Sequence, residues 1–520
     1  MCGIVGIASL SEESLGTTDK KIIKEMAAVT THRGPDSQDF YFSDKIFYGN
    51  NRLSILDPTP RSNLPFISEC ENYILCYNGE VTNYIELAAK YDLRKKYNIK
   101  TTSDTEIVLL LYIEIGEKFL NELSGMFALS LYDKIKGKLI IARDPFGINP
   151  LFYFHSNNKF YFSSEIKSLL EIPGFERRVN TTALYDYFTL AYPQGTHTMF
   201  ENITEVRNGQ AIRIDLATGE FQKFYFYRMS YKTDHSINFS EATTKVRQML
   251  TESVERNLRS DEPVGTTLSG GIDTSGIVGL IGELGKSKDL HTFSIKMGES
   301  SFDESHFQRL VSQRYKTNHH EIQVLPEEVE KHFYDHIVSL DEPSGNGAPI
   351  PIYILAKHAK KYVKVLLSGE GGDEIFNAYS VYQAWKVRKY YLRFVPKIFR
   401  KCIFSAVHAL PSNYSKLSFD FQAKRFTEGC ELHPAAAHIY WRHPFTNAEK
   451  DRFLKYHHRS TDQVVIDLYD EYSHTEELNR IAMLDIEHFI TDDLLLKNDR
   501  MFYAHSIEGR YPYLDRELID

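Results

Sequence analysis

Two patterns of apolar residues divide this chain near residue 230. Before that point, short runs such as CGIVGIAS, YILCYNGE and KLIIARDPFG are bounded by Gly, Asn, Asp and Pro, which is typical of strands joined by turns. After it, the strand patterns in PVGTTLS, LHTFSIKM and KVLLSG are separated by helical ones, which predicts a parallel α/β sheet. A mainly helical pattern follows over residues 379–510. Because 520 residues are too many for one core, we expect a strand-rich α+β domain followed by an α/β domain.

The boundary between these two domains is predicted from the sequence around residue 230. A hairpin over AIRIDLATGEFQKFYFY, with its turn at Thr218 and Gly219, closes the first pattern. The polar stretch that follows is the expected linker, at residues 228–239, so the expected domains are 2–227 and 240–520. Within the first domain, helices are predicted near 20–29 and 104–114. A long helix over 241–258, with Ser240 as its N-cap, is predicted to begin the second domain.

Bulk properties exclude several classes of protein. The formal net charge of −9, without a long run of Lys or Arg, argues against a nucleic-acid partner. The longest apolar run, 107–113, is far too short to span a membrane. The five cysteines are irregularly spaced, without a CxxC pair, which argues against disulfides and a cysteine zinc site. With no secretory signal predicted, we expect a cytoplasmic protein without a nucleic-acid or membrane partner.

The segment SGGIDTS, Ser269 to Ser275, stands between a predicted strand and a predicted helix. Two glycines allow the backbone to approach an anion closely, and the N–H groups that begin the helix are directed at it. A carboxylate at Asp273, beside bound phosphates, is best explained as a Mg²⁺ ligand. A plain strand-to-helix turn is the alternative. The nearby GLIGELGKS is one residue too long for the Walker pattern, so we predict an ATP site that releases pyrophosphate and leaves AMP on a carboxylate.

A second glycine-rich turn, LLSGEGGDEIF, follows another apolar strand. Loops at the carboxyl ends of parallel strands meet at one crevice, so Ser368 to Asp373 is expected to face the first loop. Glu370 and Asp373 would then lie near the phosphates, where one could bind metal and the other could handle a proton on the acceptor.

Cys2 follows the initiator methionine directly. When that methionine is removed, Cys2 carries a thiol and a free α-amine, whose pKa of about 7.7–8.0 lets it accept the thiol proton near neutral pH. Arg52 has a forked guanidinium that suits a substrate carboxylate, and Asp104 suits a substrate ammonium. Asn78 and Gly79, at a predicted turn, can stabilise an oxyanion. This set predicts hydrolysis of glutamine, whereas the alternative for Cys2 is a buried strand cysteine.

The motifs of the whole chain resemble, in order, those of the glutamine-hydrolysing asparagine synthetase family. The motifs that carry the resemblance are MCGIVGI, HRGPDS, NRLSILD, NGE, SDTE, GMFALSLYD, ARDPFGI, SSEIKSLL, LSGGIDTS, HHE, LDEP, LSGEGGDEIF and SIEGRYPYLD. The resemblance implies an N-terminal-nucleophile αββα glutaminase sandwich, followed by a parallel-sheet α/β ATP-pyrophosphatase domain with a mainly helical C-terminal part. It also implies a ligase, and a homodimer by analogy.

The resemblance assigns a role to each matching residue. Cys2 is the nucleophile that forms a γ-glutamyl thioester, and Glu370 supports formation of a β-aspartyl-AMP intermediate, which ammonia reaches through an internal tunnel. Glutamine is bound by Arg52, Leu53, Ser54, Ile55, Leu56, Asn78, Gly79, Glu80 and Asp104. ATP is bound by Leu268, Ser269, Gly270, Gly271, Asp273, Thr274, Ser275, Ile295, Ser368 and Gly369. A Mg²⁺ ion on the ATP pyrophosphate is assigned to Asp273 and Asp373.

Departures from the family pattern keep alternatives open. Family members continue well past YPYLD and supply a phosphate-binding lysine there, so we expect this sequence to be incomplete at its C-terminus. Lys497 and Arg500 are the local cations that could substitute. Aspartate is the favoured acceptor over another carboxylate, such as a sugar uronic acid or a secondary-metabolite precursor. A synthetase-inactive relative is a second alternative. A tRNA-modifying enzyme is a third, against which the acidic charge argues.

Overall fold

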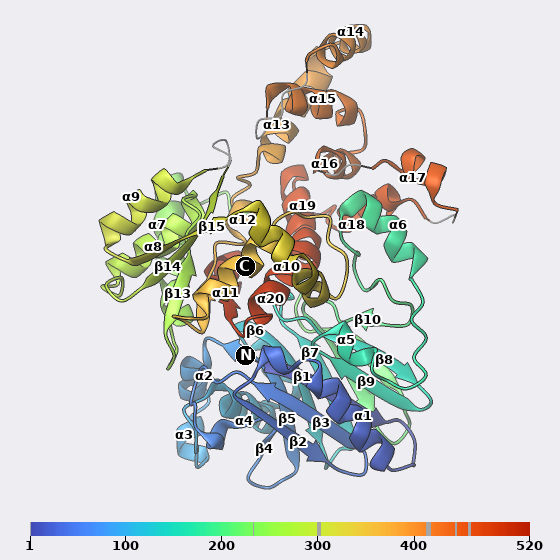
Figure 1. Cartoon of the computed structure of the whole chain (residues 1–520), viewed down its shortest axis with the longest axis vertical. Coiled ribbons are helices and arrows are strands. Elements are labelled where there is room, and N and C mark those ends of the chain that lie inside the picture. Colours follow the sequence, from blue (N-terminus) through green and yellow to red (C-terminus); the bar gives the residue numbers. More distant parts are fainter. Residues whose placement is uncertain (1, 232, 299–302, 412–417, 443–444, 456–458) are drawn as a thin grey trace.

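The computed structural model describes residues 2–231, 233–298, 303–411, 418–442, 445–455 and 459–520. Its first half contains two six-stranded antiparallel sheets that pack face to face (Figure 1). The first sheet has the order β10 (Thr204–Glu205), β8 (Phe152–Ser156), β9 (Lys159–Ser163), β1 (Cys2–Ser9), β3 (Ile46–Arg52), β2 (Ser37–Phe42). The second has the order β12 (Phe221–Tyr225), β11 (Gln210–Asp215), β7 (Lys138–Arg143), β6 (Gly125–Asp133), β5 (Tyr73–Val81), β4 (Phe66–Ile67).

Helices cover the outer face of each sheet. The first sheet is covered by α1 (Thr17–Ala28) and α5 (Ile166–Leu169), and the second by α2 (Tyr84–Lys90) and α4 (Asp104–Ile115). Two further helices of this half are α3 (Leu93–Lys96) and α6 (Thr181–Leu190). The αββα sandwich that the resemblance implied is therefore confirmed.

The position of β1 follows from its apolar sequence. It is an inner strand, and its side chains are buried on both faces. Ile4 and Ala8 pack between the two sheets, whereas Val5 and Ile7 pack under the helices. Because side chains alternate along a strand, Cys2 lies on the same face as Ile4 and Ala8, toward the second sheet.

The second half contains a five-stranded parallel sheet, as the sequence predicted. Its order is β15 (Asn318–Val324), β14 (His291–Met297), β13 (Val264–Thr267), β16 (Val365–Leu367), β17 (Glu508–Arg510). The helices between these strands are α7 (Phe239–Asn257), α8 (Ile272–Glu283), α9 (Ser305–Tyr315), α10 (Pro326–Leu340), α11 (Pro349–Ala359) and α12 (Gly372–Ile375). The strand β17 lies in the stretch expected to be helical. Its sequence, EGR, has charged residues that obscure the strand pattern. Both charges can be buried because they pair, with the Arg510 Nε atom donating to Glu508 at 2.6 Å.

The predicted start of the long helix is wrong by two residues. The helix α7 begins at Phe239, and its N-cap is Asn238, not Ser240. The Asn238 side chain accepts a hydrogen bond from the Glu241 N–H at 3.0 Å, while the Glu241 carboxylate accepts one from the Asn238 N–H. This reciprocal capping box satisfies two backbone donors at once.

The remaining chain is mainly helical. Its first part projects away from the sheets, whereas its last part returns to them (Figure 1). Its elements are α13 (Ser380–Phe394), α14 (Lys397–His408), α15 (Phe419–Gly429), α16 (Pro434–Arg442), α17 (Asn447–Phe453), α18 (Thr461–Glu471), α19 (Glu477–Leu484), the π-helical η5 (Asp485–Leu495), α20 (Leu496–Tyr503) and α21 (Arg516–Ile519). Short 3₁₀ turns are η1 (Thr31–Arg33), η2 (Pro60–Ser62), η3 (Gly116–Asn121) and η6 (Pro512–Leu514). In the described part of the chain, no helix combines the length and apolar character that crossing a bilayer requires.

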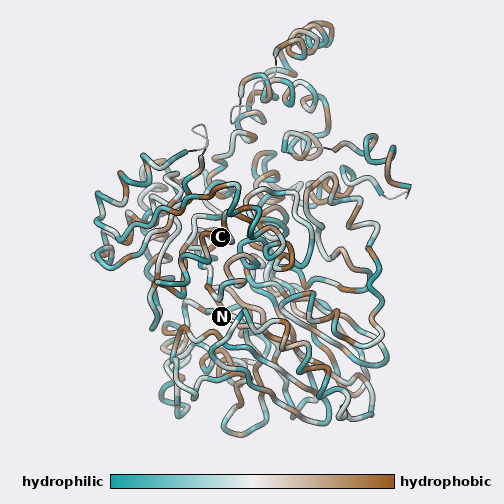
Figure 2. The backbone as a smooth tube through the Cα atoms, in the orientation of Figure 1, coloured by the Kyte–Doolittle hydropathy of each residue, from teal (hydrophilic) through white to brown (hydrophobic). Residues whose placement is uncertain are grey.

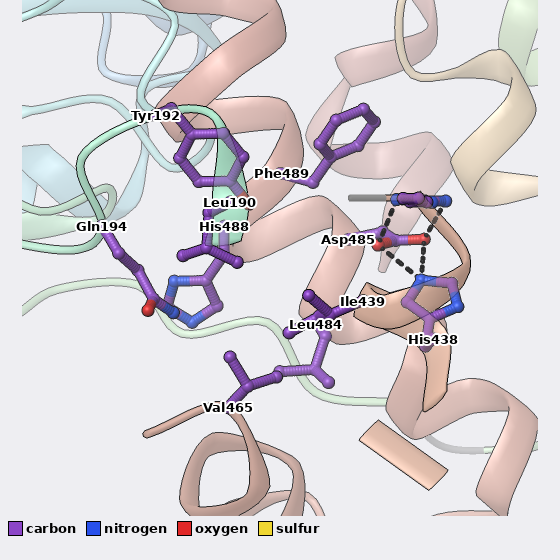
Figure 3. Close-up of a pocket in the computed structure, with 11 residues that line it drawn as sticks. Leu190, Tyr192, Gln194, His438, Ile439, Val465, Leu484, Asp485, His488 and Phe489 are labelled. Atoms are coloured by element: carbon purple, nitrogen blue, oxygen red, sulfur yellow. Dashed lines mark hydrogen bonds and ion pairs between the residues drawn. The ribbon is translucent and has the colours of Figure 1, made fainter. Parts of the chain in front are cut away.

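A buried charged cluster around Asp485 joins the helices of this region (Figure 3). Asp485 accepts hydrogen bonds from both terminal nitrogens of Arg442 at 2.8 Å and lies 2.9 Å from His438 Nε2. The Tyr382 hydroxyl also donates to it. Burial alone would raise the pKa of Asp485, but Arg442 and His438 lower it to about 2. The cavity beside this cluster measures about 30 Å³, which is room for ordered water.

Replacing Asp485 with Asn should lower the free energy of unfolding by about 3 kcal/mol, because it leaves the buried Arg442 charge without its counterion. Thermal and urea unfolding would measure the loss. Asp470→Asn, which changes an exposed carboxylate on α18, is the control and should change stability by less than about 0.5 kcal/mol. Equal effects of the two substitutions would contradict this account.

Candidate active sites

The structure places Cys2 against the side chain of Asn78. Cys2 begins β1, opposite Arg52 in the register of β1 with β3, and is 4% exposed. Its backbone nitrogen donates a hydrogen bond to Asn78 Oδ1 at 2.7 Å. The Asn78 Nδ2 atom is buried and has no hydrogen-bond partner among the described residues. A buried amide donor without a partner is costly, so this nitrogen is available to an oxygen atom of a ligand.

Two neighbours fix the position of Asn78 and Gly79. The Asn149 Nδ2 atom donates to the Asn78 carbonyl at 2.9 Å. A Cβ atom at Gly79 would lie 2.6 Å from the Tyr77 ring, which no real side chain tolerates. The close packing of this ring therefore requires glycine at position 79, beside the predicted oxyanion donor.

The guanidinium of Arg52 is directed at its own loop. Its two terminal nitrogens donate to the carbonyls of Thr59, Leu56 and Asp57 and to the side chain of Asn63, at 2.6–3.1 Å. Both terminal nitrogens of the Arg52 guanidinium are therefore hydrogen-bonded to the loop in this structure. A substrate carboxylate could pair with them only after some of these bonds are exchanged.

Asp104 is likewise satisfied by protein groups. Its carboxylate accepts hydrogen bonds from the Tyr77 hydroxyl at 2.6 Å, the Val81 N–H at 2.9 Å and the Ser103 hydroxyl at 3.2 Å. Burial raises the pKa of Asp104 above its ordinary value. The structure therefore places Asp104 beside β5 as a buried acceptor, with an ammonium partner still to be tested.

The rest of the predicted glutamine pocket packs against the second half of the chain. Leu53 and Ile55 belong to a core that contains Leu268 and Tyr513 from the second half, whereas Leu56 belongs to a core of the first half. The Ser54 N–H donates to Asp36 at 2.9 Å. The predicted glutamine loop is thus part of the contact between the two halves.

Glu80 lies in a buried charged group that crosses the same boundary. Its Oε2 atom is 3.4 Å from the Arg510 guanidinium on β17. Burial raises the pKa of Glu80 well above its ordinary value, and Arg510 offsets part of that rise. The Arg510 carbonyl in turn accepts the Ser368 N–H at 2.8 Å, so a predicted glutamine-site residue is linked to a predicted ATP-site residue.

The two glycine-rich loops border one cavity of about 890 Å³. They follow β13 and β16, which are neighbours in the parallel sheet, so both loops lie at its carboxyl edge. Predicted residues that line the cavity are Leu268, Ser269, Gly271, Asp273, Thr274, Ile295, Ser368, Gly369, Glu370 and Asp373. Its size and position fit a nucleotide.

Gly270 and Ser275 do not line this cavity in the structure. Gly270 has φ +89° and is packed against α9, so it shapes the turn. Ser275 lies in the first turn of α8, and its hydroxyl is buried without a partner among the described residues. The first loop is also braced from within, because Ser269 and Thr274 hydroxyls lie 3.0 Å apart.

The two loops touch at Asp273. A Cβ atom at Gly369 would lie 3.1 Å from the Asp273 Cβ, and one at Gly372 would lie 2.5 Å from the Asp273 Cγ. Burial, followed by the charges of Asp373 and Glu370, raises the pKa of Asp273 to about 6. Glycine in the second loop therefore lets Asp273 lie close enough to Asp373 and Glu370 for their charges to act on it.

Glu370 is held from two sides. One carboxylate oxygen accepts the Ser368 hydroxyl, and the other accepts the Asn498 side-chain amide at 2.6 Å. Asn498 belongs to α20, far along the sequence from the loop. The orientation of Glu370 therefore depends on the C-terminal helix, which sequence motifs alone did not reveal.

Further residues of the cavity lie outside the set that the sequence assigned to the ATP site. These additional residues include Glu304, Gln308, Glu374, Tyr379, Lys497, Asn498 and Phe502. Lys497 is the single cation among the described residues that line the cavity. Of the two cations considered from the sequence, Arg500 instead lies at the contact between the halves, 3.2 Å from the Ser164 carbonyl.

A buried ion pair connects the two candidate sites. The Arg33 guanidinium, in the HRGPD segment, donates to the Cys2 carbonyl at 3.3 Å and makes two 2.7 Å bonds to the Asp499 carboxylate. It also donates to Glu165 at 2.9 Å. Asp499 directly follows Asn498, the residue that holds Glu370.

Comparison with known proteins agrees with this arrangement. A family model described as "Glutamine amidotransferase domain" matches residues 1–225, and one described as "Asparagine synthase" matches residues 245–520. Asparagine synthetase (glutamine-hydrolysing) 1 of Bacillus subtilis strain 168 is 31% identical, over 100% of this chain and 80% of that protein. Putative asparagine synthetase (glutamine-hydrolysing) 2 of Methanocaldococcus jannaschii is 32% identical, over 77% and 79%. Asparagine synthetase B (glutamine-hydrolysing) of Escherichia coli strain K12 is 29% identical, over 73% and 65%.

Both halves are matched in the order that the motifs indicated, and each matched half contains one of the two candidate sites. The chain belongs to the glutamine-hydrolysing asparagine synthetase family.

Proposed function

We propose that this protein converts aspartate to asparagine, with glutamine as nitrogen donor and ATP as activating substrate, and releases glutamate, AMP and pyrophosphate. Glutamine hydrolysis is assigned to residues 2–227 and amide formation to residues 240–520, joined by 228–239. One observation carries the proposal: the Cys2–Asn78 pair is connected, through Arg33 and Asp499, to the cavity between two glycine-rich loops. A homodimer stays a prediction.

In the first half-reaction, removal of Met1 would leave the Cys2 nitrogen as a free amine, held by Asn78 Oδ1. The amine accepts the thiol proton, and the thiolate attacks the side-chain carbonyl carbon of glutamine. The oxyanion that forms accepts hydrogen bonds from Asn78 Nδ2, whose donors have no partner among the described residues, and from the Gly79 region. The leaving nitrogen takes the proton back from the α-ammonium and departs as ammonia. Water then cleaves the thioester to give glutamate and the free thiol.

The pocket for the rest of glutamine would consist of the segment from Arg52 to Leu56, with Glu80 and Asp104. Because the Arg52 fork is engaged by its own loop, binding of the α-carboxylate requires exchange of those loop bonds. The engaged fork supports a pocket that closes around glutamine and opens to release glutamate, rather than one fully formed beforehand.

In the second half-reaction, ATP would occupy the cavity between the two loops, with its phosphates at Ser269 to Ser275 and Ser368 to Gly369. The aspartate β-carboxylate attacks the α-phosphorus, pyrophosphate leaves, and ammonia then displaces AMP from the acyl-adenylate. Glu370, oriented by Asn498 and Ser368, is positioned to accept a proton from the attacking ammonia. Lys497 provides the positive charge for an anionic group of either substrate.

Asp273 and Asp373 fit the Mg²⁺ ion that normally accompanies ATP. Burial raises the pKa values of both carboxyls, and the charge of Asp373 raises that of Asp273 further, so a cation near them would relieve that repulsion. A Mg²⁺ ion that accompanies a nucleotide takes one or two ligands from carboxylates and others from phosphate and water. The bound ion would neutralise phosphate charge.

Cys2→Ala should reduce glutamine hydrolysis by on the order of 10³-fold or more, because the nucleophile is gone. The same variant should still form product from free ammonium. Glutamate release and AMP formation, measured separately, would show this split. Cys70→Ala, which changes an exposed thiol, is the matched control and should leave both activities unchanged. Full glutaminase activity of Cys2→Ala would overturn the nucleophile assignment.

Aspartate should stimulate pyrophosphate release from ATP more than any other carboxylate in a panel that includes glutamate and sugar uronic acids. Pyrophosphate release with free ammonium isolates this step from glutamine hydrolysis. Stimulation by a uronic acid alone would redirect the acceptor to that class and leave the family chemistry intact. No release with any acceptor, with glutamine hydrolysis intact, would identify a synthetase-inactive relative.

Gly372→Ala should lower ATP-dependent pyrophosphate release by about tenfold or more, because its Cβ would displace the Asp273 carboxyl and small misplacements at a reacting centre are costly. Glutamine hydrolysis should be retained. Gly16→Ala is the control, since a Cβ there would meet no atom within 4 Å. Unchanged ATP kinetics in Gly372→Ala would exclude Asp273 from the phosphate site.

A further inference from the structure

The helices α13 and α14 have an unusual charge pattern. The sequence from 375 to 419 contains no Asp or Glu, although the whole chain has a net charge of −9. The seven cationic residues of these helices are Lys386, Arg388, Lys389, Arg393, Lys397, Arg400 and Lys401. A dense positive region on a negatively charged protein is an electrostatic feature that selects an anionic partner.

Most of these cations are not used by the fold. Arg388 donates to the carbonyls of Cys430 and Leu432, and Arg400 pairs with Glu431. The other five side chains are exposed: Lys386, Lys389, Arg393, Lys397 and Lys401. Over the described ranges of the chain, no carboxylate lies within ion-pair distance of any of these five. Their charge is therefore available to a partner.

Apolar side chains are exposed along the same helices. On α13, Val387, Tyr390 and Phe394 are 55%, 64% and 69% exposed, and their spacing of three and four residues places them along one face. On α14, Ile398 and Phe399 are 70% and 61% exposed, and no residue of this helix is buried. Large exposed apolar groups gathered in one region mark an interaction surface.

This surface lies apart from both candidate active sites. Figure 1 shows α14 at the outer end of the helical projection, beyond α13 and α15, while the two antiparallel sheets lie at the opposite end. Figure 2 shows hydrophobic and hydrophilic residues alternating along these helices. We name the exposed residues of α13 and α14, from Lys386 to Lys401, the α13–α14 tip.

We propose that the α13–α14 tip binds the surface of a membrane that contains anionic phospholipid. An amphipathic helix with Lys and Arg beside Phe, Ile and Tyr inserts its apolar side chains at the level of the headgroups. Each Lys or Arg near an anionic bilayer adds attraction, and lysine stems extend along the apolar layer while the ammonium stays in water. The tip supplies both kinds of side chain and no acidic residue to oppose them.

The charge of the tip favours a lipid surface over a second copy of this chain. Two tips facing each other would bring like charges together, and opposed like charges at an interface are unfavourable. The sequence-based expectation of no membrane partner rested on the length of the longest apolar run. That argument concerns segments that span a bilayer, whereas the tip would bind its surface.

Flotation of the full chain with lipid vesicles tests the proposal. The protein should float with vesicles of phosphatidylcholine mixed with phosphatidylglycerol, should stay behind with phosphatidylcholine alone, and should dissociate as salt is raised. Lys397→Glu/Lys401→Glu and, independently, Ile398→Ser/Phe399→Ser should each weaken binding by about tenfold or more. Both variants should retain glutamine hydrolysis, which confirms that they are folded.

Two matched variants serve as controls. Lys360→Glu/Lys361→Glu makes the same change in net charge at exposed positions beyond α11, and Tyr334→Ser/Val338→Ser removes exposed apolar groups from α10. Both should bind vesicles as the parent chain does. Absence of binding to anionic vesicles would overturn the proposal, as would equal losses in the control and tip variants. A tip variant that changes the oligomeric state and not vesicle binding would assign the surface to a second copy instead.

Discussion

The buried pair between Arg33 and Asp499 is the contact on which the two-site arrangement depends. Burial alone would lower the pKa of Arg33, but Asp499 and Glu165 raise it above its ordinary value, so the guanidinium stays charged. Two ions taken out of water are tolerated only with well-aligned bonds, and here both terminal nitrogens of Arg33 meet the same carboxylate. Loss of one partner would leave a buried charge unpaired, at a cost of about 3–5 kcal/mol.

The segment from Asn498 to Arg510 holds both halves of the chain at once. Asn498 orients Glu370 in the nucleotide cavity, and the next residue binds Arg33, which in turn contacts the Cys2 carbonyl. At the other end, Arg510 lies beside Glu80 while its carbonyl fixes Ser368. A rigid element shared by two sites can carry coupling between them. The two sites are therefore linked through this segment, although the described residues that line the nucleotide cavity all belong to the second half.

The features that could be predicted from the sequence are those that local residue patterns determine. Strand, glycine-rich turn and helix follow one another along the chain, so the loop at Ser269 to Ser275 and its place at a sheet edge could be found from residues alone. The N-cap at Asn238 could have been found as well, because Asn and Glu stand three residues apart there. The sequence offered Lys497 only as a local cation and gave no signal for Asn498, since their place in the cavity depends on packing of α20 against distant loops. The hydrogen bonds of the Arg52 guanidinium likewise depend on tertiary structure. They go to carbonyls of a loop whose path no residue pattern specifies.

The acidic residues at the nucleotide cavity lower the stability of the folded chain, and their presence is explained by function. The charges of Glu370 and Asp373 act on Asp273, and burial raises the pKa values of both aspartates, so their charged forms are unfavourable there. Glycines at 369 and 372 create this crowding by removing the side chains that would hold the loops apart. Residues that oppose stability at such a point are explained by a ligand of opposite charge. Burial of apolar side chains in the cores of both halves supplies the stability that lets the cavity retain this repulsion until ATP and its cation bind.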